Sequence, residues 1–207
     1  STAELRAGGA VGREGVSSVG FRGAPAINLA RCSRVRPLSA SIAGTNEAPH
    51  HAMAAAVETG GIFEVTVTGT VLEVRDGSGL IERCPTCGRV IQNGQCRSHG
   101  AVDGEDDLRV KAILDDGTDT VTVVLDDELT ADVYGGGLED ALAAATEAMD
   151  KDVVAESIAA DLVGRTYTVR GSLSVDEYGA TLDATAFEPA SADPAAAARD
   201  ALAEVRE

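Results

Sequence analysis

The central part of the chain begins with a stretch in which apolar and polar residues alternate, a pattern typical of a β-strand with one buried face. In residues 63–74 the apolar positions start at Phe63, pass a glycine at Gly69 and continue at Leu72 in the opposite phase. A glycine at a change of phase indicates a bulge or a sharp bend. The pattern therefore predicts one long, bent strand.

A second alternating stretch, 108–114, is followed by turn residues at 115–117 and by a third alternating stretch, 121–125. Two such stretches around a short turn predict a β-hairpin. The apolar residues of 127–163 then recur with the period of an amphipathic helix. Three consecutive glycines, 135–137, divide this region and predict that it forms more than one helix.

Two more alternating stretches, 167–173 and 182–186, are joined by turn residues at 176–179. The order is thus three strands, then helices, then two strands. This is the order of the five-stranded Greek-key barrel called the OB-fold, so we expect a mainly β protein with helices. The aromatic residues expected in the core are Phe63, Tyr167 and Phe187.

Composition divides the chain into four parts. Residues 1–44 are rich in Gly and Arg, whereas residues 45–59 show no strand pattern and are interpreted as a linker. Residues 60–188 contain the predicted barrel. Residues 189–207 begin with a Pro- and Ala-rich linker, and Pro194, which follows an aspartate, predicts the first turn of a C-terminal helix.

Acidic residues outnumber basic ones. The 207 residues include 34 Asp and Glu against 17 Lys and Arg, which gives a net charge of −17, and the only lysines are Lys111 and Lys151. We interpret this balance as adaptation to very high salt, a halophilic property, because salt screens the self-repulsion of a carboxylate surface. The alternative is an acidic surface that repels nucleic acid or binds a basic partner.

Several classes of protein are not expected from this sequence. There is no apolar run of the length that a transmembrane helix needs, and the first residues lack the pattern of a signal peptide. We therefore expect no membrane partner and a cytoplasmic location. The motifs G-x-S-x-G, H-E-x-x-H and the phosphate-binding loop are also absent from the sequence, so we expect a binding protein and not an enzyme.

The most informative stretch contains Cys84, Cys87, Cys96 and His99 in the pattern C-x2-C-x8-C-x2-H, with a glycine after each pair. Three thiolates and one imidazole form a closed tetrahedral set, which predicts a structural zinc ion. A redox pair or a disulfide would not need His99, and the βαβ context of a redox motif is absent from the sequence. The remaining cysteine, Cys32, is expected to be a thiol without a ligand role.

A small barrel with a four-ligand zinc knuckle inserted after its first strand resembles the C-terminal zinc-containing OB domain of the large subunit of replication protein A. The match extends over 60–188 and is closest to the salt-loving archaeal members. Residues 21–29 are similar to the closing hairpin of a preceding OB domain, so residues 1–44 are expected to be such a hairpin or a remnant of that domain. The stretches that carry the resemblance are 71–85, 96–100, 112–117, 170–174 and 178–180.

The resemblance implies single-stranded DNA binding in replication, recombination and repair, association with the nucleoid, and contacts with other replication protein A subunits through the C-terminal helix. Alternation places Arg109 and Lys111 on the outer face of the second strand, and the second and third strands form the binding face of an OB barrel. Arg170 is expected to project from the fourth strand, Tyr178 to stack on a base from a loop tip, and Arg75 to contribute beside the knuckle. Pairing of these arginines with carboxylates is the alternative.

Two other functions are compatible with the same residues. One is an RNA-associated OB module with a zinc ribbon, as in exosome cap proteins. The other is an assembly scaffold whose C-terminal helix docks on a partner. Comparing single-stranded DNA with RNA of one sequence distinguishes the first alternative, and deleting residues 189–207 tests the second.

Overall fold

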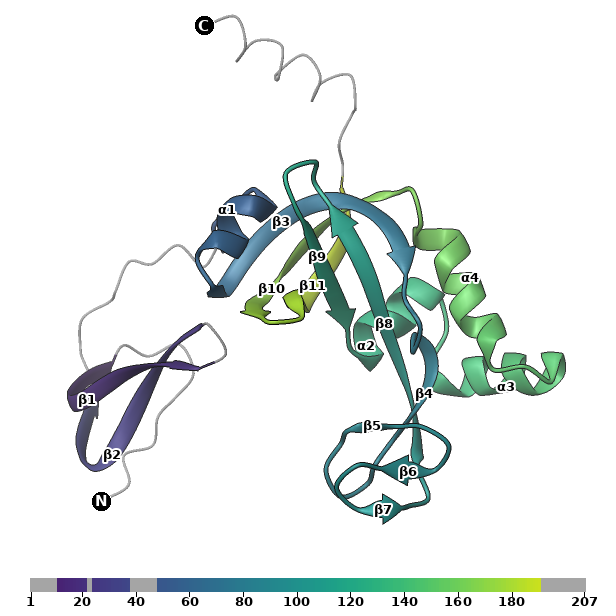
Figure 1. Ribbon diagram of the computed structural model, residues 1–207, viewed down its shortest axis with the longest axis horizontal. Helices are drawn as coiled ribbons and strands as arrows, with labels where there is room; N and C mark the ends of the chain where they lie inside the picture. Colours follow the sequence, from purple (N-terminus) through teal and green to yellow (C-terminus); the bar gives the residue numbers. More distant parts are fainter. Residues whose placement is uncertain (1–10, 22–23, 38–47, 191–207) are drawn as a thin grey trace, which may run out of the picture.

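The computed structural model describes residues 11–21, 24–37 and 48–190. Its first element is an antiparallel hairpin of β1 (Val11–Phe21) and β2 (Ala24–Pro37), drawn in purple in Figure 1. This hairpin falls within the segment for which we expected a closing hairpin of a preceding domain. The predicted C-terminal helix lies outside the described residues.

The main body is a closed five-stranded barrel. Around the ring the order is β3, β10, β11, β9 and β8, and β8 pairs back with β3. The β9–β11 pair is parallel, and the other pairs are antiparallel. This is the OB-fold topology, as the element order predicted. The five strands are β3 (Gly61–Val74), β8 (Glu105–Asp115), β9 (Thr120–Leu125), β10 (Thr166–Asp176) and β11 (Gly179–Pro189).

Between β3 and β8 the chain leaves the barrel. Strand β4 (Gly79–Arg83) pairs with the first half of β8, so that the two extend from the barrel as a ribbon. At the end of the ribbon the chain forms a small loop-rich unit, which we call the knuckle (residues 84–101; Figure 1). Its short strands are β5 (Val90–Ile91), β6 (Gln95–Cys96) and β7 (Gly100–Ala101).

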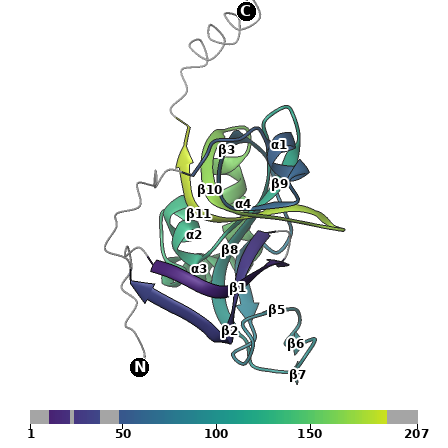
Figure 2. The same ribbon diagram turned by 90° about the vertical axis from the view of Figure 1, so that its left-hand side faces the viewer.

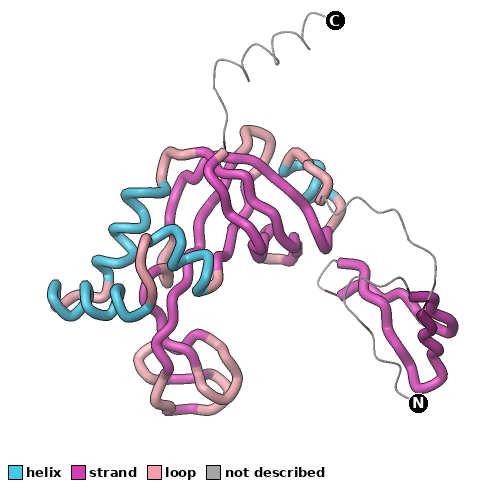
Figure 3. Tube along the Cα trace, turned by 180° about the vertical axis from the view of Figure 1, so that it is seen from behind, coloured by secondary structure: helices cyan, strands magenta, loops and turns pink. Residues whose placement is uncertain are grey.

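Three helices follow β9 and cover one side of the barrel (Figure 3). They are α2 (Asp127–Tyr134), α3 (Leu138–Ala148) and α4 (Asp152–Leu162). The side chain of Asp126 accepts a hydrogen bond from the Leu129 N–H and caps α2, while Gly135, with φ 76°, ends it. The glycine triplet thus separates α2 from α3, as predicted. No helix in the described part of the chain is long and apolar enough to cross a membrane.

The core expectation was wrong for Phe63, whose exposed fraction is 66%. Between Ile62 and Val65 strand β3 carries one residue more than the facing β10, where Ile62 pairs with Leu173. This bulge lets Ile62 turn toward the core and Phe63 toward solvent. Tyr167 is buried as expected, and its ring stacks on the half-buried Phe187 at a centroid distance of 4.3 Å.

The bend predicted at Gly69 is also misplaced. Buried positions continue in one phase through Gly69 to Val71, and the bulge against β8 lies between Val71 and Glu73. Gly69 has a different role, since a Cβ atom there would lie 2.6 Å from the carbonyl oxygen of Asp115 and 2.6 Å from Met53 Cε. A glycine is therefore needed for close approach of two segments.

The segment expected to be a linker contains a helix, α1 (Met53–Glu58), in which Met53 and Ala56 are fully buried against the barrel. The carboxylate of Asp116, in the β8–β9 turn, accepts a 2.7 Å hydrogen bond from the Met53 N–H at the start of this helix. The same carboxylate accepts from the N–H and hydroxyl of Thr118 at 2.9 and 2.6 Å. A carboxylate distant in sequence thus fixes α1, which explains why local patterns did not predict it.

We expect Asp116→Ala to lower the free energy of unfolding by about 1–2 kcal/mol, the usual cost of removing a cap or a charged hydrogen bond. Although burial disfavours the charged form, hydrogen bonds from Thr118 and Met53 lower the pKa of Asp116. Its contribution is therefore present above the ordinary aspartate pKa of about 3.9 and is lost as the pH falls below it. Urea denaturation at neutral and acidic pH measures the effect. The exposed Asp103→Ala is the control, and equal losses for both variants would contradict the prediction.

Candidate metal centre and cationic groove

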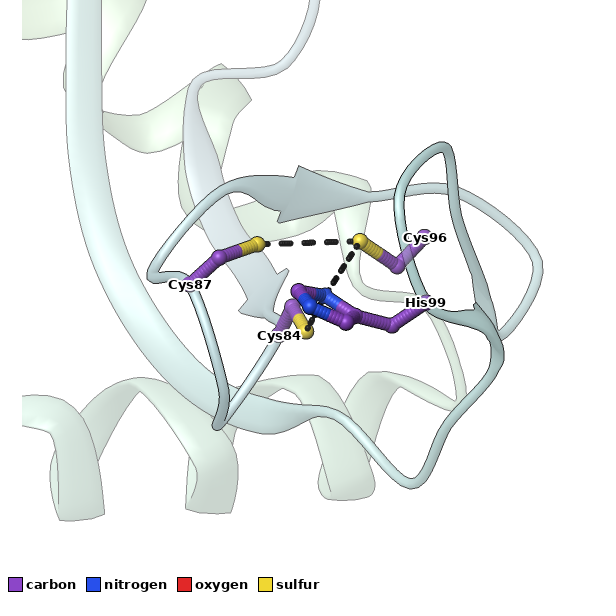
Figure 4. Close-up of side chains that lie close together, drawn as sticks. All are labelled: Cys84, Cys87, Cys96 and His99. Carbon is purple, nitrogen blue, oxygen red and sulfur yellow. Dashed lines mark hydrogen bonds between the residues drawn. The ribbon is translucent and has the colours of Figure 1, made fainter.

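The knuckle brings the four predicted metal ligands together (Figure 4). One ligand atom from each of Cys84, Cys87, Cys96 and His99 lies within 4.8 Å of all the others. The sulfur atoms of Cys87 and Cys96 are 3.7 Å apart, and Nδ1 of His99 lies 3.5 Å from the Cys84 sulfur and 3.6 Å from the Cys96 sulfur.

These separations agree with the edges of a coordination tetrahedron. With metal–sulfur bonds of about 2.3 Å and a metal–nitrogen bond of about 2.0–2.1 Å, the sulfur–sulfur edge is about 3.8 Å and the sulfur–nitrogen edge about 3.6 Å. All four ligands come from one segment of the chain, and the set leaves no open position for a substrate. The cluster could therefore hold one four-coordinate metal ion with a structural role.

The glycine that follows each ligand pair has a positive φ and shapes its half of the knuckle. Gly88 has φ 67° and Gly100 has φ 72°, a region that other residues adopt at a cost. In the first half the Gly88 N–H donates to the carbonyl oxygen of Cys84, and the Cys84 N–H donates to that of Arg89, both at 2.8 Å. The turn thereby holds the first pair of ligands toward the second.

Backbone groups also favour the ionised form of two of the thiols. The N–H of Ser98 is the main cause that lowers the pKa of the Cys96 thiol to about 6, against an opposing effect of burial. Burial likewise opposes ionisation of Cys84, but the N–H groups of Thr86 and Cys87 outweigh it and lower its pKa. Thiolates are the form that binds metal, so the backbone prepares these ligands for an ion.

The knuckle has its own small core and a firm attachment to the ribbon. Cys84, Ile91 and Cys96 are buried together, apart from the barrel core. The guanidinium of Arg83 pairs with the carboxylate of Asp107 on β8 and donates a 3.2 Å hydrogen bond to the carbonyl oxygen of Gly88. Arg83 therefore connects the first ligand turn to a barrel strand.

Between the knuckle, the ribbon and the start of α4 lies a hollow of about 780 Å³, which we call the cationic groove. Its charged lining consists of five cationic and two anionic side chains, although the chain as a whole carries −17. Both lysines of the protein are among them. The charged lining residues are Arg89, Arg97, Arg109, Lys111, Lys151, Asp76 and Glu82.

Arg109 and Lys111 project from the outer face of β8, as the alternation predicted, while the alternate residues Leu108 and Val110 are buried. The guanidinium of Arg109 donates to the carbonyl oxygen of Gly77 at 2.7 and 3.2 Å, which fixes its position beside the groove. Burial lowers the pKa of Lys111, and Arg109 and Arg75 add to this effect. Positive charges are therefore crowded at this point of the barrel surface.

The other predicted contacts are not gathered at the groove. The Arg170 guanidinium donates to Glu64 on the neighbouring strand β3, with Nε 2.9 Å from the carboxylate. Pairing with a carboxylate was the alternative to a DNA contact for this arginine. Arg75 is exposed in the turn before β4 and does not line the groove, although its N–H donates to the carbonyl oxygen of Lys111 at 2.7 Å. Tyr178 is 89% exposed in the β10–β11 turn, and this turn projects to the same side of the barrel as the knuckle in Figure 2.

Sequence reasoning did not single out Arg89 or Lys151. Arg89 lies inside the knuckle, where its guanidinium donates to the Ser98 hydroxyl at 2.9 Å. Lys151 precedes α4, far from the knuckle in sequence. The sequence did hold one signal, because Lys151 and the predicted contact Lys111 are its only two lysines.

Comparison with known proteins gives a fold-level result. No protein-family profile matches the chain, and no curated protein matches it. Its structure is similar to a chain in the solved structure of a replication protein A heterotrimer bound to single-stranded DNA, with a TM-score of 0.50 and 13% identity. The alignment covers 95% of this chain and 54% of that one, so this chain spans about half the length of its structural neighbour. The similarity shows an OB fold like that of replication protein A.

Proposed function

We propose that this protein binds single-stranded DNA along the cationic groove and acts without catalysis in DNA replication, recombination and repair. The observation that carries the proposal is the concentration of five cationic side chains, including both lysines, in one hollow of a chain whose net charge is −17. Exposed basic residues scattered on an acidic surface usually pair with carboxylates, as Lys151 does here with Glu82 and Asp106. A concentration of five cations in one hollow nevertheless favours a polyanion.

The position of the groove supports the same ligand. OB barrels bind oligonucleotides on the face of their second and third strands, which here are β8 and β9. Arg109 and Lys111 lie on the outer side of that face. The exposed ring of Tyr178 offers a stacking surface for an unpaired base, worth about 1–3 kcal/mol per base in such proteins. A base within a duplex cannot stack in this way, so an unpaired strand is favoured.

We propose zinc as the ion of the knuckle. Three thiolates and one imidazole are typical ligands of structural zinc, and the Cys87–Cys96, Cys84–His99 and Cys96–His99 distances agree with zinc bond lengths. When bound, the ion would join both halves of the knuckle. It would thereby hold Arg89 and Arg97 at the edge of the groove.

The wider setting follows from the resemblance and the charge. We propose a protein of the haloarchaeal replication protein A type, working in the cytoplasm at the nucleoid, with residues 60–188 as the zinc-containing OB domain. Residues 1–44 would then be the end of a preceding OB-like domain, 45–59 a connection whose helix α1 packs on the barrel, and 189–207 the contact with other subunits. In high salt the electrostatic attraction of phosphates is weak, so hydrogen bonds and stacking would carry much of the affinity.

Fluorescence anisotropy with a labelled oligo(dT), over a series of KCl concentrations, tests the proposal. We expect binding of the zinc-loaded full chain that weakens as salt rises. An RNA oligomer of matched sequence and a DNA duplex are the competitors. Stronger binding of the RNA would favour the RNA-associated module, and the absence of any binding would overturn the proposal.

A further inference from the structure

Lys151 lines the cationic groove but is held by two carboxylates. Its Nζ lies 3.0 Å from Oε1 of Glu82 and 3.6 Å from Oδ1 of Asp106. Glu82 is on β4 and Asp106 is its paired position on β8. The ammonium group therefore bridges both strands of the ribbon that carries the knuckle, from a position just before α4.

All three side chains remain open to solvent. The exposed fractions are 56% for Lys151, 36% for Glu82 and 39% for Asp106. Ion pairs exposed to this extent contribute only about 0–1 kcal/mol to stability, so the pair can open without loss of the fold. Glu82 itself lines the groove, and its carboxylate repels any anion that enters.

We propose that Lys151 contacts a phosphate of the bound strand and that the Glu82 carboxylate competes with this phosphate for the ammonium group. Glu82 thereby sets the affinity and the salt dependence of the groove. The inference rests on the proposed binding of single-stranded DNA. In the free protein the ammonium of Lys151 donates to Glu82. When a strand occupies the groove, a phosphate oxygen takes the place of the carboxylate, and Glu82 turns to solvent.

The inference predicts a gain of binding from a substitution in the binding site. We expect Glu82→Gln to tighten binding of labelled oligo(dT) about fivefold, or about 1 kcal/mol. We also expect the slope of log K against log[KCl] to steepen by up to about 0.7, because no freed Glu82 carboxylate then takes up a cation to offset the one released from the phosphate at Lys151. Anisotropy titrations of the full, zinc-loaded chain measure both quantities. The matched control is Glu105→Gln, an equal change of charge on β8 outside the groove.

A double-mutant cycle separates release of Lys151 from simple charge repulsion. We expect Lys151→Gln to weaken binding, and we expect Glu82→Gln to give a clearly smaller gain in that background. The inference is overturned if Glu82→Gln binds no more tightly than Glu105→Gln, or if its gain is undiminished without Lys151. If the wild-type protein does not bind oligo(dT), the proposed function fails as well. If the wild type binds and substitutions of Arg109 and Lys111 weaken it, an unchanged Glu82→Gln affinity removes this inference alone.

Discussion

Replacing Cys96 by serine should abolish stable metal binding and weaken binding of single-stranded DNA, while the barrel stays folded. Removing one of four ligands opens the coordination set, so we expect metal affinity to fall by more than about 100-fold, since even loss of an outer hydrogen-bond partner costs about 10–100-fold. The small buried cluster and the Arg89–Ser98 hydrogen bond join the two halves of the knuckle more weakly than a bound ion would, so without the ion Arg89 and Arg97 lose their fixed positions beside the groove. We expect a loss of DNA affinity of about tenfold or more from these two cations.

The barrel should survive because its core is separate from that of the knuckle. Cys84, Ile91 and Cys96 form one buried cluster, whereas the barrel strands and helices pack around another. Metal content by mass spectrometry, oligo(dT) anisotropy and thermal unfolding together measure the outcome, and a chelator should reproduce it in the wild-type protein. Cys32→Ser serves as the matched control. Full metal content and undiminished DNA binding in Cys96→Ser would contradict both the metal site and its role.

The second large effect is expected from Arg109→Gln combined with Lys111→Gln. These substitutions remove two cations from the β8 face while keeping polar side chains there. We expect DNA affinity to fall about 30-fold at low salt, or about 2 kcal/mol. The slope of log K against log[KCl] should become shallower by about 1.4, because the variant would neutralise two fewer phosphates of a single strand.

Arg170→Gln is the informative comparison for this variant. Arg170 was also predicted to contact DNA, but it pairs with Glu64 and does not line the groove. We therefore expect its substitution to leave the salt slope unchanged. Because Arg109 also donates to the carbonyl oxygen of Gly77, thermal unfolding and the single Lys111→Gln variant check that the weaker binding comes from charge. Equal effects of Arg170→Gln and the double variant would place the DNA elsewhere on the barrel.

Local patterns predicted the barrel well because the alternation of apolar and polar residues within a strand shows which of its faces is buried. The alternation at Leu108 and Val110 reflects one buried face, and this face is the same in the sequence and in the structure. At Phe63 the same reasoning failed. Whether an alternating residue faces inward depends on bulges, and the extra residue of β3 relative to β10 is set by pairing with a strand about a hundred positions away.

The metal ligands could likewise be predicted from the sequence, whereas the cationic groove could not. The sequence by itself determined the four ligands, because Cys84 to His99 is a short span in which spacing and glycine turns dictate geometry. Only the tertiary structure decided which cations meet. The packing of α4 places Lys151 against Glu82 on the ribbon. Arg170 instead pairs with Glu64 on the neighbouring strand and is not available to the groove. Contacts between residues far apart in the chain depend on how the elements pack, and no local pattern records that packing.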